Sequence, residues 1–293
     1  MYIIETKFYF FPVEKDKKQI KSGFFDKMYC ELPDSLNICT LGSGSKGNAF
    51  AFSSNQFGTL LVDAGFSAKQ MENKLQSAEI KIESIKAVLL THDHDDHSHG
   101  CRVFCDKYGI PLYCSYQTAH YLNGKNKLPG KVVQFEAGDR FEIDGFQISA
   151  FAVQHDAIDP VGFRIKCHGK EIGIATDLGE INALCKQRLS LCDALILESN
   201  YDKEMLYASD RALHLKRRIA GRMGHLDNND ALNALEELLS DRSSLLMLVH
   251  ISNDCNCYEL VEKNLSCCLE KIRRSRMDFY VARQHEVSPW FAV

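Results

Sequence analysis

The 293-residue sequence has neither a strong excess of one charge nor a long hydrophobic segment. Its formal net charge is only −4, so no global basic field marks a nucleic-acid binder, and any such binding needs a local patch. The apolar stretch at the start is short, interrupted by charges and without a small-residue cleavage site, unlike a secretory signal. No segment approaches the ~20 apolar residues that span a bilayer. We therefore expect a cytoplasmic protein without membrane insertion.

Cysteine is abundant, yet the spacing that would give it a structural role is missing. None of the close pairs among the 12 cysteines has the C-x-x-C spacing of a structural zinc site. The chain is also much longer than the small secreted domains that disulfides stabilise. We therefore expect these cysteines to be free thiols in a reducing compartment.

Residues 1–35 differ in composition from the rest of the chain. They mix aromatic residues with a charged stretch over residues 14–18, and Met28 is an alternative initiator. We interpret them as an N-terminal extension that is either disordered, as termini often are, or the result of a mis-called start. Residues 36–293 contain no repeat, low-complexity tract or long linker, and so predict one domain.

From Leu36 onward, strand-like and helix-like patterns alternate. A hairpin is expected over residues 140–153, with its turn at Asp144 and Gly145. Strands are expected over residues 36–41, 49–53, 59–62, 86–91, 171–176, 193–198 and 244–249, and helices over 67–76 and 227–240. Hairpins mixed with strand–helix units predict an α/β (α+β) protein with two sheets sandwiched by helices, rather than one doubly wound sheet.

A histidine or aspartate follows the end of several apolar strands. The residues in these positions are Asp63, His92, His155, Asp177 and His250. Sites in layered α/β proteins gather beyond strand ends, where rigid elements aim side chains from short loops. Polar residues that only filled turns would be scattered rather than placed so regularly. The pattern therefore predicts one site assembled from distant parts of the chain.

The run from His92 to His97 (HDHDDH) has the composition of a metal-binding loop. His92 and His94 are two residues apart, so an extended segment points both to one side. Asp96 and His97 follow a turn of the chain and can serve a second ion. Imidazole nitrogens with carboxylate oxygens, and no thiolate, favour Zn²⁺, Mn²⁺ or iron over Ca²⁺ or Mg²⁺.

The same run resembles the signature of the metallo-β-lactamase superfamily. Further segments agree in order with one bacterial branch, the WalJ/YycJ (VicX) family, from about Leu36 to Val293. These segments include residues 41–48 (LGSGSKGN), 63–69 (DAGFSAK), 160–163 (PVGF), 175–179 (ATDLG), 197–200 (LESN), 224–226 (GHL) and 288–291 (SPWF). The resemblance does not cover the first 35 residues.

This resemblance implies a four-layer αββα sandwich, the metallo-β-lactamase fold, with two divalent metal ions, Zn²⁺ or Mn²⁺, in its cleft. By carry-over, one ion takes His92, His94 and His155. The second takes Asp96, His97 and His250, and Asp177 bridges both. Asp63 is the supporting carboxylate that orients the ligand loop without touching metal.

His225 lies just before the helix expected from residue 227, and helix N-termini favour anions. It resembles the non-ligand histidine of the RNase Z-like phosphodiesterases, which acts at the scissile phosphate or leaving oxygen. The stretch from Arg211 to His225 holds several cations, which favours a phosphate backbone. Asp96 and His225 are the predicted catalytic residues, and Arg217, Arg218, Arg222 and Asn200 the predicted substrate contacts.

These features together predict a dinuclear phosphodiester hydrolase. The residues support phosphodiester cleavage, and the resemblance implies DNA as partner and 5′-to-3′ exonuclease activity. The alternatives are an RNA-processing nuclease, a hydrolase of a thioester, lactone or cyclic nucleotide, and a regulatory binding protein with a little-used site. The basic stretch and His225 favour a nuclease over a small-molecule hydrolase, and the complete ligand set argues against a purely regulatory protein.

Overall fold

The computed structural model describes residues 34–293. The predicted N-terminal extension over residues 1–35 therefore lies, apart from its last two residues, outside the described residues. Asp34–Val293 form one compact unit. Within this unit no helix has the length and apolar character that crossing a membrane requires.

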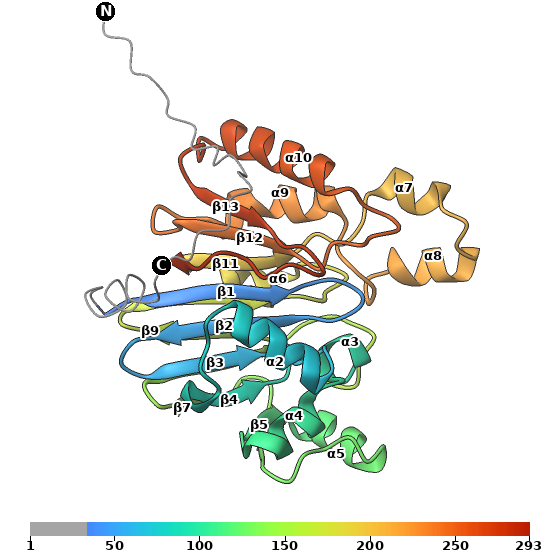
Figure 1. The fold of residues 1–293 in the computed structure, drawn as a ribbon. Coiled ribbons are helices and arrows are strands. Elements are labelled where there is room, and N and C mark those ends of the chain that lie inside the picture. The colour runs from blue at the N-terminus through green and yellow to red at the C-terminus, as the bar shows by residue number, and fades with distance from the viewer. Residues whose placement is uncertain (1–33) are drawn as a thin grey trace, which may run out of the picture. The chain divides into compact units, whose positions relative to one another are not determined.

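The first sheet is built mainly from the N-terminal half of this unit (Figure 1). Its strand order is β14-β1-β2-β3-β4-β5-β6. The strands are β1 (Leu36–Gly42), β2 (Ala49–Ser54), β3 (Gly58–Val62), β4 (Ile85–Leu89), β5 (Leu112–Ser115), β6 (Val132–Phe135) and β14 (Phe291–Ala292). Strands β3 to β6 run parallel, whereas β1 pairs antiparallel with β2 and β14.

The second sheet is built from the C-terminal half, in the order β13-β12-β11-β10-β9-β8-β7. Its strands are β7 (Arg140–Ile143), β8 (Phe146–Ala152), β9 (Val161–Cys167), β10 (Lys170–Ala175), β11 (Ala194–Glu198), β12 (Leu245–Val249) and β13 (Asp278–Val281). Strands β10 to β13 run parallel, so their carboxyl ends meet at one edge of the sheet.

Helices cover the outer face of each sheet, and three apolar cores separate the layers. The helices are α2 (Ala68–Ser77), α3 (Asp95–Ser98), α4 (Cys101–Tyr108), α5 (Tyr116–Gly124), α6 (Ala183–Leu189), α7 (Lys203–Ala208), α8 (Leu213–Ile219), α9 (Asn228–Leu238) and α10 (Tyr258–Lys271). One core lies between the sheets, one between the first sheet and α2, α4 and α5, and one between the second sheet and α6, α9 and α10. This arrangement confirms the predicted αββα sandwich.

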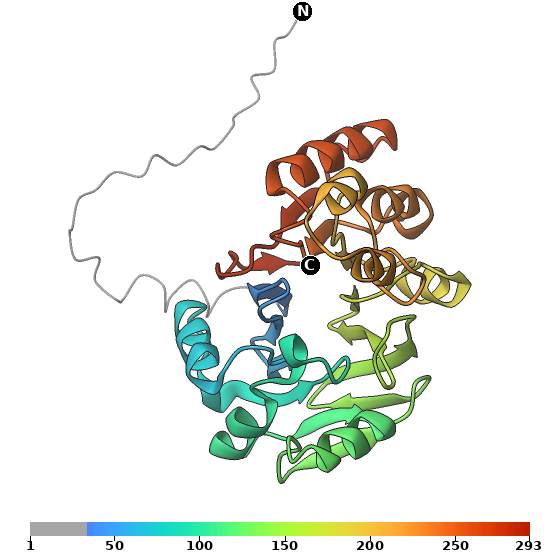
Figure 2. The ribbon, with the colours of Figure 1, turned by 90° about the vertical axis from the view of Figure 1, so that its right-hand side faces the viewer.

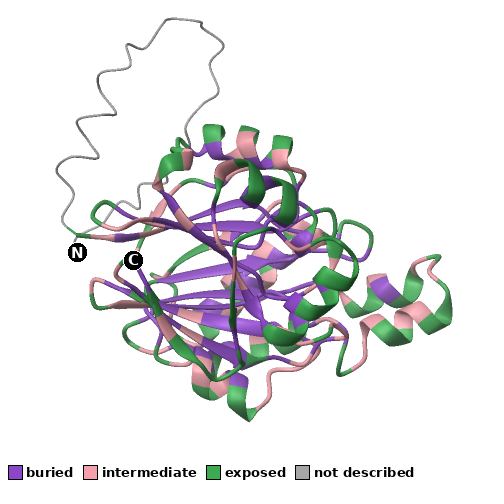
Figure 3. Ribbon diagram, turned by 90° about the horizontal axis from the view of Figure 1, so that it is seen from below, coloured by how far each residue is buried: buried purple, intermediate pink, exposed green. Residues whose placement is uncertain are grey.

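Most strands are largely buried, whereas the edge strands β6, β7 and β13 and the outer sides of the helices are partly exposed (Figure 3). Phe50 and Phe163 are fully buried in the central core, and Met71 of α2 is fully buried in the first outer core. Burial of apolar surface of this kind is the dominant favourable contribution to folding. Packing in the sandwich thus fixes the positions of the strand ends and of the side chains that follow them.

Local sequence signals explain several element boundaries. Ser67 caps α2, and its hydroxyl accepts the Gln70 amide N–H while the Gln70 side chain reaches back to the Ser67 amide. Asp144 and Gly145 both have positive φ, 44° and 84°, and connect β7 to β8 as the predicted tight turn. The predicted elements from residues 36 to 62, 140 to 153 and 227 to 249 are therefore confirmed within two residues or so at their ends.

The cysteines of the described region are all free, and most of them are buried. Cys101, Cys105 and Cys114 lie in the outer core of the first sheet. Burial raises the pKa of the Cys105 and Cys114 thiols to about 12, which keeps them protonated and unreactive. These cysteines pack as small apolar side chains.

Candidate metal centre

The ligand loop of the first sheet joins β4 to α3. His92 and His94 lie in this loop and Asp96 and His97 lie in α3 itself, and together they are four of the seven predicted ligands. Asp63 supports this loop. It is fully buried, directly follows β3 and has a left-handed backbone conformation (φ 63°). Because β3 and β4 are parallel neighbours, the chain brings Asp63 next to the start of this loop.

The second sheet contributes side chains from separate strand ends. His155 follows β8, Asp177 follows β10 and His250 follows β12. His250 also adopts a left-handed backbone conformation (φ 56°), which is uncommon for a non-glycine residue and is typical of functional positions. The regular placement of polar residues after strands in the sequence is thus a real convergence in space.

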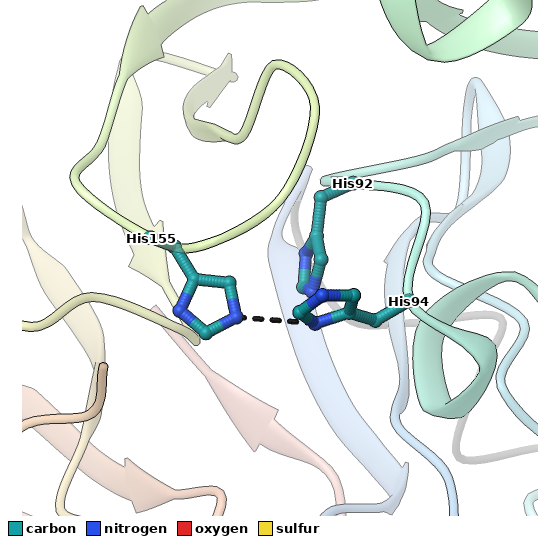
Figure 4. Close-up of side chains that lie close together, drawn as sticks. All are labelled: His92, His94 and His155. Carbon is teal, nitrogen blue, oxygen red and sulfur yellow. Dashed lines mark hydrogen bonds between the residues drawn. The ribbon is translucent and has the colours of Figure 1, made fainter. Parts of the chain in front are cut away.

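One group of ligand candidates consists of three histidines (Figure 4). Nδ1 of His94 lies 3.2 Å from Nε2 of His155, and the His92 ring centroid is 4.8 Å from that of His94 and 5.1 Å from that of His155. One nitrogen of each ring lies within 4.8 Å of the others. Three imidazole nitrogens that face a common point are a donor set for a transition-metal ion.

A second group lies beside the first and is richer in carboxylates. Nε2 of His250 is 3.3 Å from Oδ2 of Asp96, and Nε2 of His97 is 3.6 Å from the same oxygen. Asp177 lies against both groups, with Oδ2 2.9 Å from Nε2 of His97 and Oδ1 3.7 Å from Nε2 of His155. The seven predicted ligands therefore come together in space, and Asp177 is placed where one carboxylate can reach both groups.

Supporting hydrogen bonds hold the ring nitrogens that point away from the centre. Nδ1 of His97 lies 2.7 Å from Oδ2 of Asp63, and Nδ1 of His155 lies 2.8 Å from the carbonyl oxygen of Gly224. Nδ1 of His92 lies 3.0 Å from the Thr91 hydroxyl, which itself donates to Asp63. In each ring such a partner fixes the tautomer and leaves Nε2 free to bind an ion, as is usual for metal-binding histidines.

Buried carboxylates set the electrostatics of the centre. Burial alone would lower the pKa of His250, but Asp177, Asp96 and Glu198 raise it to about 10. Burial also opposes protonation of His97, and Asp177 is the largest of the nearby charges that raise its pKa well above the usual value. The carboxylates therefore stabilise positive charge on the neighbouring histidine rings. Divalent cations can replace these protons, because ligand protons leave when a metal binds.

Unsatisfied polar atoms show that the residues fit a metal. Within residues 34–293, Nε2 of His92 and both carboxylate oxygens of Asp177 are buried without a hydrogen bond. Nε2 of His97, 2.9 Å from Oδ2 of Asp177, carries no proton when Nδ1 of the same ring donates to Asp63. Buried polar atoms are nearly always paired, so these atoms need a partner from outside the chain. A nitrogen and oxygen donor set suits divalent metal ions, and the fit is supported by both groups of ligand candidates.

Next to the centre, His225 is held by a fully buried glutamate that the sequence analysis did not single out. Oε1 of Glu198 lies 2.8 Å from Nδ1 of His225 and 2.8 Å from Nδ1 of His250. Its other oxygen, Oε2, accepts the backbone N–H groups of Leu178 and Leu226, both at 3.0 Å. Glu198 ends β11, so the strand-end pattern that marked the ligands could also have marked this residue.

The predicted anion site at the helix after His225 is not open. Asp227 is the N-cap of α9, and its Oδ1 accepts the amide N–H groups of Asn229 and Asp230 at 2.7 and 3.0 Å. The residue's own carboxylate therefore occupies the place that a phosphate would take. His225 owes its position to Glu198 instead.

A cleft of about 610 Å³ opens over the metal centre. It is lined by Ser45, Asp93, His94, Asp95, Asp96, Tyr121, Lys125, Lys127, Asp177, Arg218, His225 and His250.

Among the predicted substrate contacts, Arg218 lines the cleft, where its guanidinium pairs with Asp156. Arg217 and Arg222 are exposed outside the lining, and Arg222 pairs with Glu180 at 2.7 Å. Asn200 is buried and donates to the His250 carbonyl at 2.8 Å, so it supports a ligand loop.

Comparison with known proteins agrees with this geometry. Residues 59–251 match the model of the beta-lactamase superfamily domain. The metallo-beta-lactamase fold protein YhfI from Bacillus subtilis has a solved structure that is similar to this one, with a TM-score of 0.65 and 18% identity, over 87% of this chain and 99% of that chain. The fold and the site thus define a metal-dependent hydrolase of the metallo-β-lactamase superfamily that uses divalent metal.

Two curated relatives narrow the class. The exodeoxyribonuclease YycJ of Bacillus anthracis is 32% identical over 239 residues, which cover 80% of this chain and 90% of the relative. The exodeoxyribonuclease WalJ of Streptococcus pneumoniae (serotype 2, strain D39) is 34% identical over 230 residues, which cover 77% of this chain and 85% of the relative. The chain belongs to the WalJ/YycJ family.

Proposed function

We propose that this protein is a dinuclear metal-dependent phosphodiesterase that degrades DNA from the 5′ end. The observation that carries the proposal is the convergence of seven nitrogen and oxygen ligand candidates, with the His225–Glu198 pair beside them, in one open cleft. The names of the WalJ and YycJ relatives support DNA as the substrate. Zn²⁺ and Mn²⁺ are the metals that this donor set favours.

In this proposal His92, His94 and His155 would hold one ion, Asp96, His97 and His250 would hold the other, and Asp177 would contribute to both. Asp63 and Glu198 orient the ligands from behind. When bound, divalent ions would lower the pKa of a nearby water and would neutralise charge that builds up on a phosphate. The protein's part is to hold both ions in fixed positions on the rigid strand ends of two sheets.

Two side chains act on the substrate itself. Asp96 is partly exposed and lines the cleft, where its carboxylate orients the attacking water and accepts its proton. Nδ1 of His225 donates to Glu198, which leaves Nε2 of His225 available to the cleft. As the phosphorus–oxygen bond to the leaving group breaks, His225 in its protonated form donates a proton to the leaving oxygen. The Glu198 carboxylate stabilises that protonated ring.

The test is to incubate the purified protein with Mn²⁺ or Zn²⁺ and with duplex DNA labelled at either the 5′ or the 3′ end. Early release of the 5′ label, before the 3′ label, is the expected result. Matched RNA and a thioester are offered under the same conditions. Asp96→Ala should abolish DNA hydrolysis, whereas Asp241→Ala, which removes a fully exposed carboxylate outside the cleft, should not change it.

Other results would redirect the proposal. Degradation of RNA with DNA untouched would assign an RNA-processing nuclease. Cleavage of the thioester with both nucleic acids untouched would assign a small-molecule hydrolase on the same metal centre. Equal loss of both DNA labels would support nuclease activity and contradict the 5′-to-3′ direction.

A further inference from the structure

One wall of the cleft presents an aromatic ring and a lysine on the same helical face. Tyr121 of α5 and Lys125, the residue that caps α5, both line the cleft. The Lys125 amide N–H donates to the Tyr121 carbonyl oxygen at 3.2 Å, so the two side chains are one turn apart and neighbours. Nζ of Lys125 lies 5.6 Å from the centroid of the Tyr121 ring. The Tyr121 side chain nevertheless stays 37% exposed, which leaves ring surface open to the cleft.

The charge of Lys125 is available, in contrast to that of its neighbours. Lys127 pairs with Asp95, and Arg218 of α8, which also lines the cleft, pairs with Asp156. Within residues 34–293, no carboxylate lies within ion-pair distance of the Lys125 ammonium group. An anion that enters the cleft therefore meets an uncompensated cation at Lys125, beside the open ring of Tyr121.

A ring face next to a free ammonium group matches the two parts of a nucleotide. Every base has a π face that stacks on an aromatic side chain, whatever its sequence. The phosphate backbone pairs with lysine, also without regard to sequence. A simple phosphate ester would use only the lysine, and an apolar acyl group would use only the ring.

We propose that Tyr121 and Lys125 form a nucleotide subsite, in which an unpaired base stacks on Tyr121 and a phosphate of the same strand pairs with Lys125. This inference rests on the proposed nuclease function and specifies the state of its substrate. A base inside a duplex cannot offer its face to a side chain, so the subsite selects a frayed or unpaired strand end. Helix α5 (green) packs on the first sheet and lies on the lower side of Figure 2, whereas α7 to α9 (yellow to orange), which flank His225 in the sequence, lie on its upper side. Tyr121, Lys125 and His225 all line the cleft, so a strand held at the subsite would cross the metal centre to reach His225.

The experiment removes each partner of the stacking contact in turn, the base by an abasic nucleotide and the ring by substitution of Tyr121. DNA strands that each carry one abasic nucleotide, at successive positions from the 5′ end, are compared with intact DNA. The proteins are the full-length wild type, Tyr121→Ala, Tyr121→Phe and Tyr116→Ala. Tyr116 is the matched control, because it lies on the same helix, is 55% exposed and does not line the cleft.

For the wild type, an abasic nucleotide at one position should raise KM about tenfold, which is the size expected for one lost base–aromatic stack. Tyr121→Ala should raise KM on intact DNA by a similar factor and should no longer respond to the abasic nucleotide, while kcat changes less than twofold. Tyr121→Phe, which keeps the ring, should retain the response to the abasic nucleotide that Tyr121→Ala loses, and Tyr116→Ala should behave as the wild type does. Lys125→Ala should raise KM for every strand, and Lys131→Ala, an exposed lysine outside the cleft, should not.

Independent, additive effects of the abasic nucleotide and Tyr121→Ala would overturn the subsite, because contacts that act together are non-additive. Equal effects of Tyr116→Ala and Tyr121→Ala would also overturn it. If the wild type degrades DNA and Tyr121→Ala has the same KM, the subsite is contradicted and the proposed nuclease function is not. A wild type that degrades no DNA removes the proposed function and the subsite with it.

Discussion

The two sheets supply the metal centre in different ways. The first sheet gives its ligands in one short run, from His92 to His97, in the loop after β4 and in α3. The second sheet gives one residue at a time, from the ends of β8, β10 and β12. One short segment thus carries four of the ligand candidates, whereas the other three come from separate strand ends of the second sheet.

The largest expected effect comes from the residue placed between the two groups. Asp177→Ala should leave less than one metal ion per chain and lower DNA hydrolysis by roughly 10³-fold or more, well beyond the loss from removing a supporting partner. His94→Ala, in the run of the first sheet, should lose mainly one ion. Plasma mass spectrometry of the dialysed proteins and hydrolysis rates measure both. If Asp177→Ala kept the metal content of His94→Ala, Asp177 would not join the two groups.

The next effect separates two histidines of the second sheet. His225→Ala should retain both ions and lower kcat by about 10²- to 10⁴-fold, the usual contribution of a positioned proton donor. His250→Ala should lose metal, because its ring lies 3.3 Å from Asp96. Metal content and kcat at saturating DNA are the readouts. Loss of metal from His225→Ala would make His225 a ligand instead.

The supporting carboxylates allow the sharpest comparison between the sheets. Asp63→Asn and Glu198→Gln should each weaken metal binding about 10- to 100-fold, since each anchors a ligand histidine. Only Glu198→Gln should also lower kcat once metal is saturating, because Glu198 alone also holds His225. Metal titration followed by rate measurement distinguishes them. Equal kcat values for the two saturated variants would contradict the assigned role of Glu198.

The smallest effect concerns the basic stretch of the second sheet. Arg218→Ala should raise KM for DNA several-fold, because Arg218 lines the cleft, and a phosphate contact typically contributes a modest amount. Arg222→Ala should change KM less, since Arg222 is exposed outside the lining. Measuring both variants at two salt concentrations tests the difference. A larger effect from Arg222→Ala would place the DNA path over α8 rather than through the cleft.

Much of this site could be predicted because its signals are local. The run from His92 to His97 is visible as a pattern, and Asp63 and His250 follow strands whose apolar character is equally visible. The hairpin turn at Asp144 could be predicted because its turn residues dictate the backbone. The sandwich then follows from the mixture of hairpins and strand–helix units.

The features that could not be predicted depend on contacts between side chains that are distant in the sequence or on how a side chain is used locally. Asn200 belongs to a polar segment after β11, and nothing local indicates that its amide is used by the His250 carbonyl. The phosphate site expected before α9 fails because the cap residue Asp227 turns its own carboxylate onto the helix. The short helices α3 to α8 are also difficult, because a few residues carry little periodicity.

The most direct measurement is the amount of metal bound by the full chain after reconstitution with Zn²⁺ or Mn²⁺ and dialysis, relative to protein. We expect two ions per chain in the wild type, since one group of ligands lies on each side of Asp177. One ion per chain, or none, would contradict a dinuclear centre held between the two sheets.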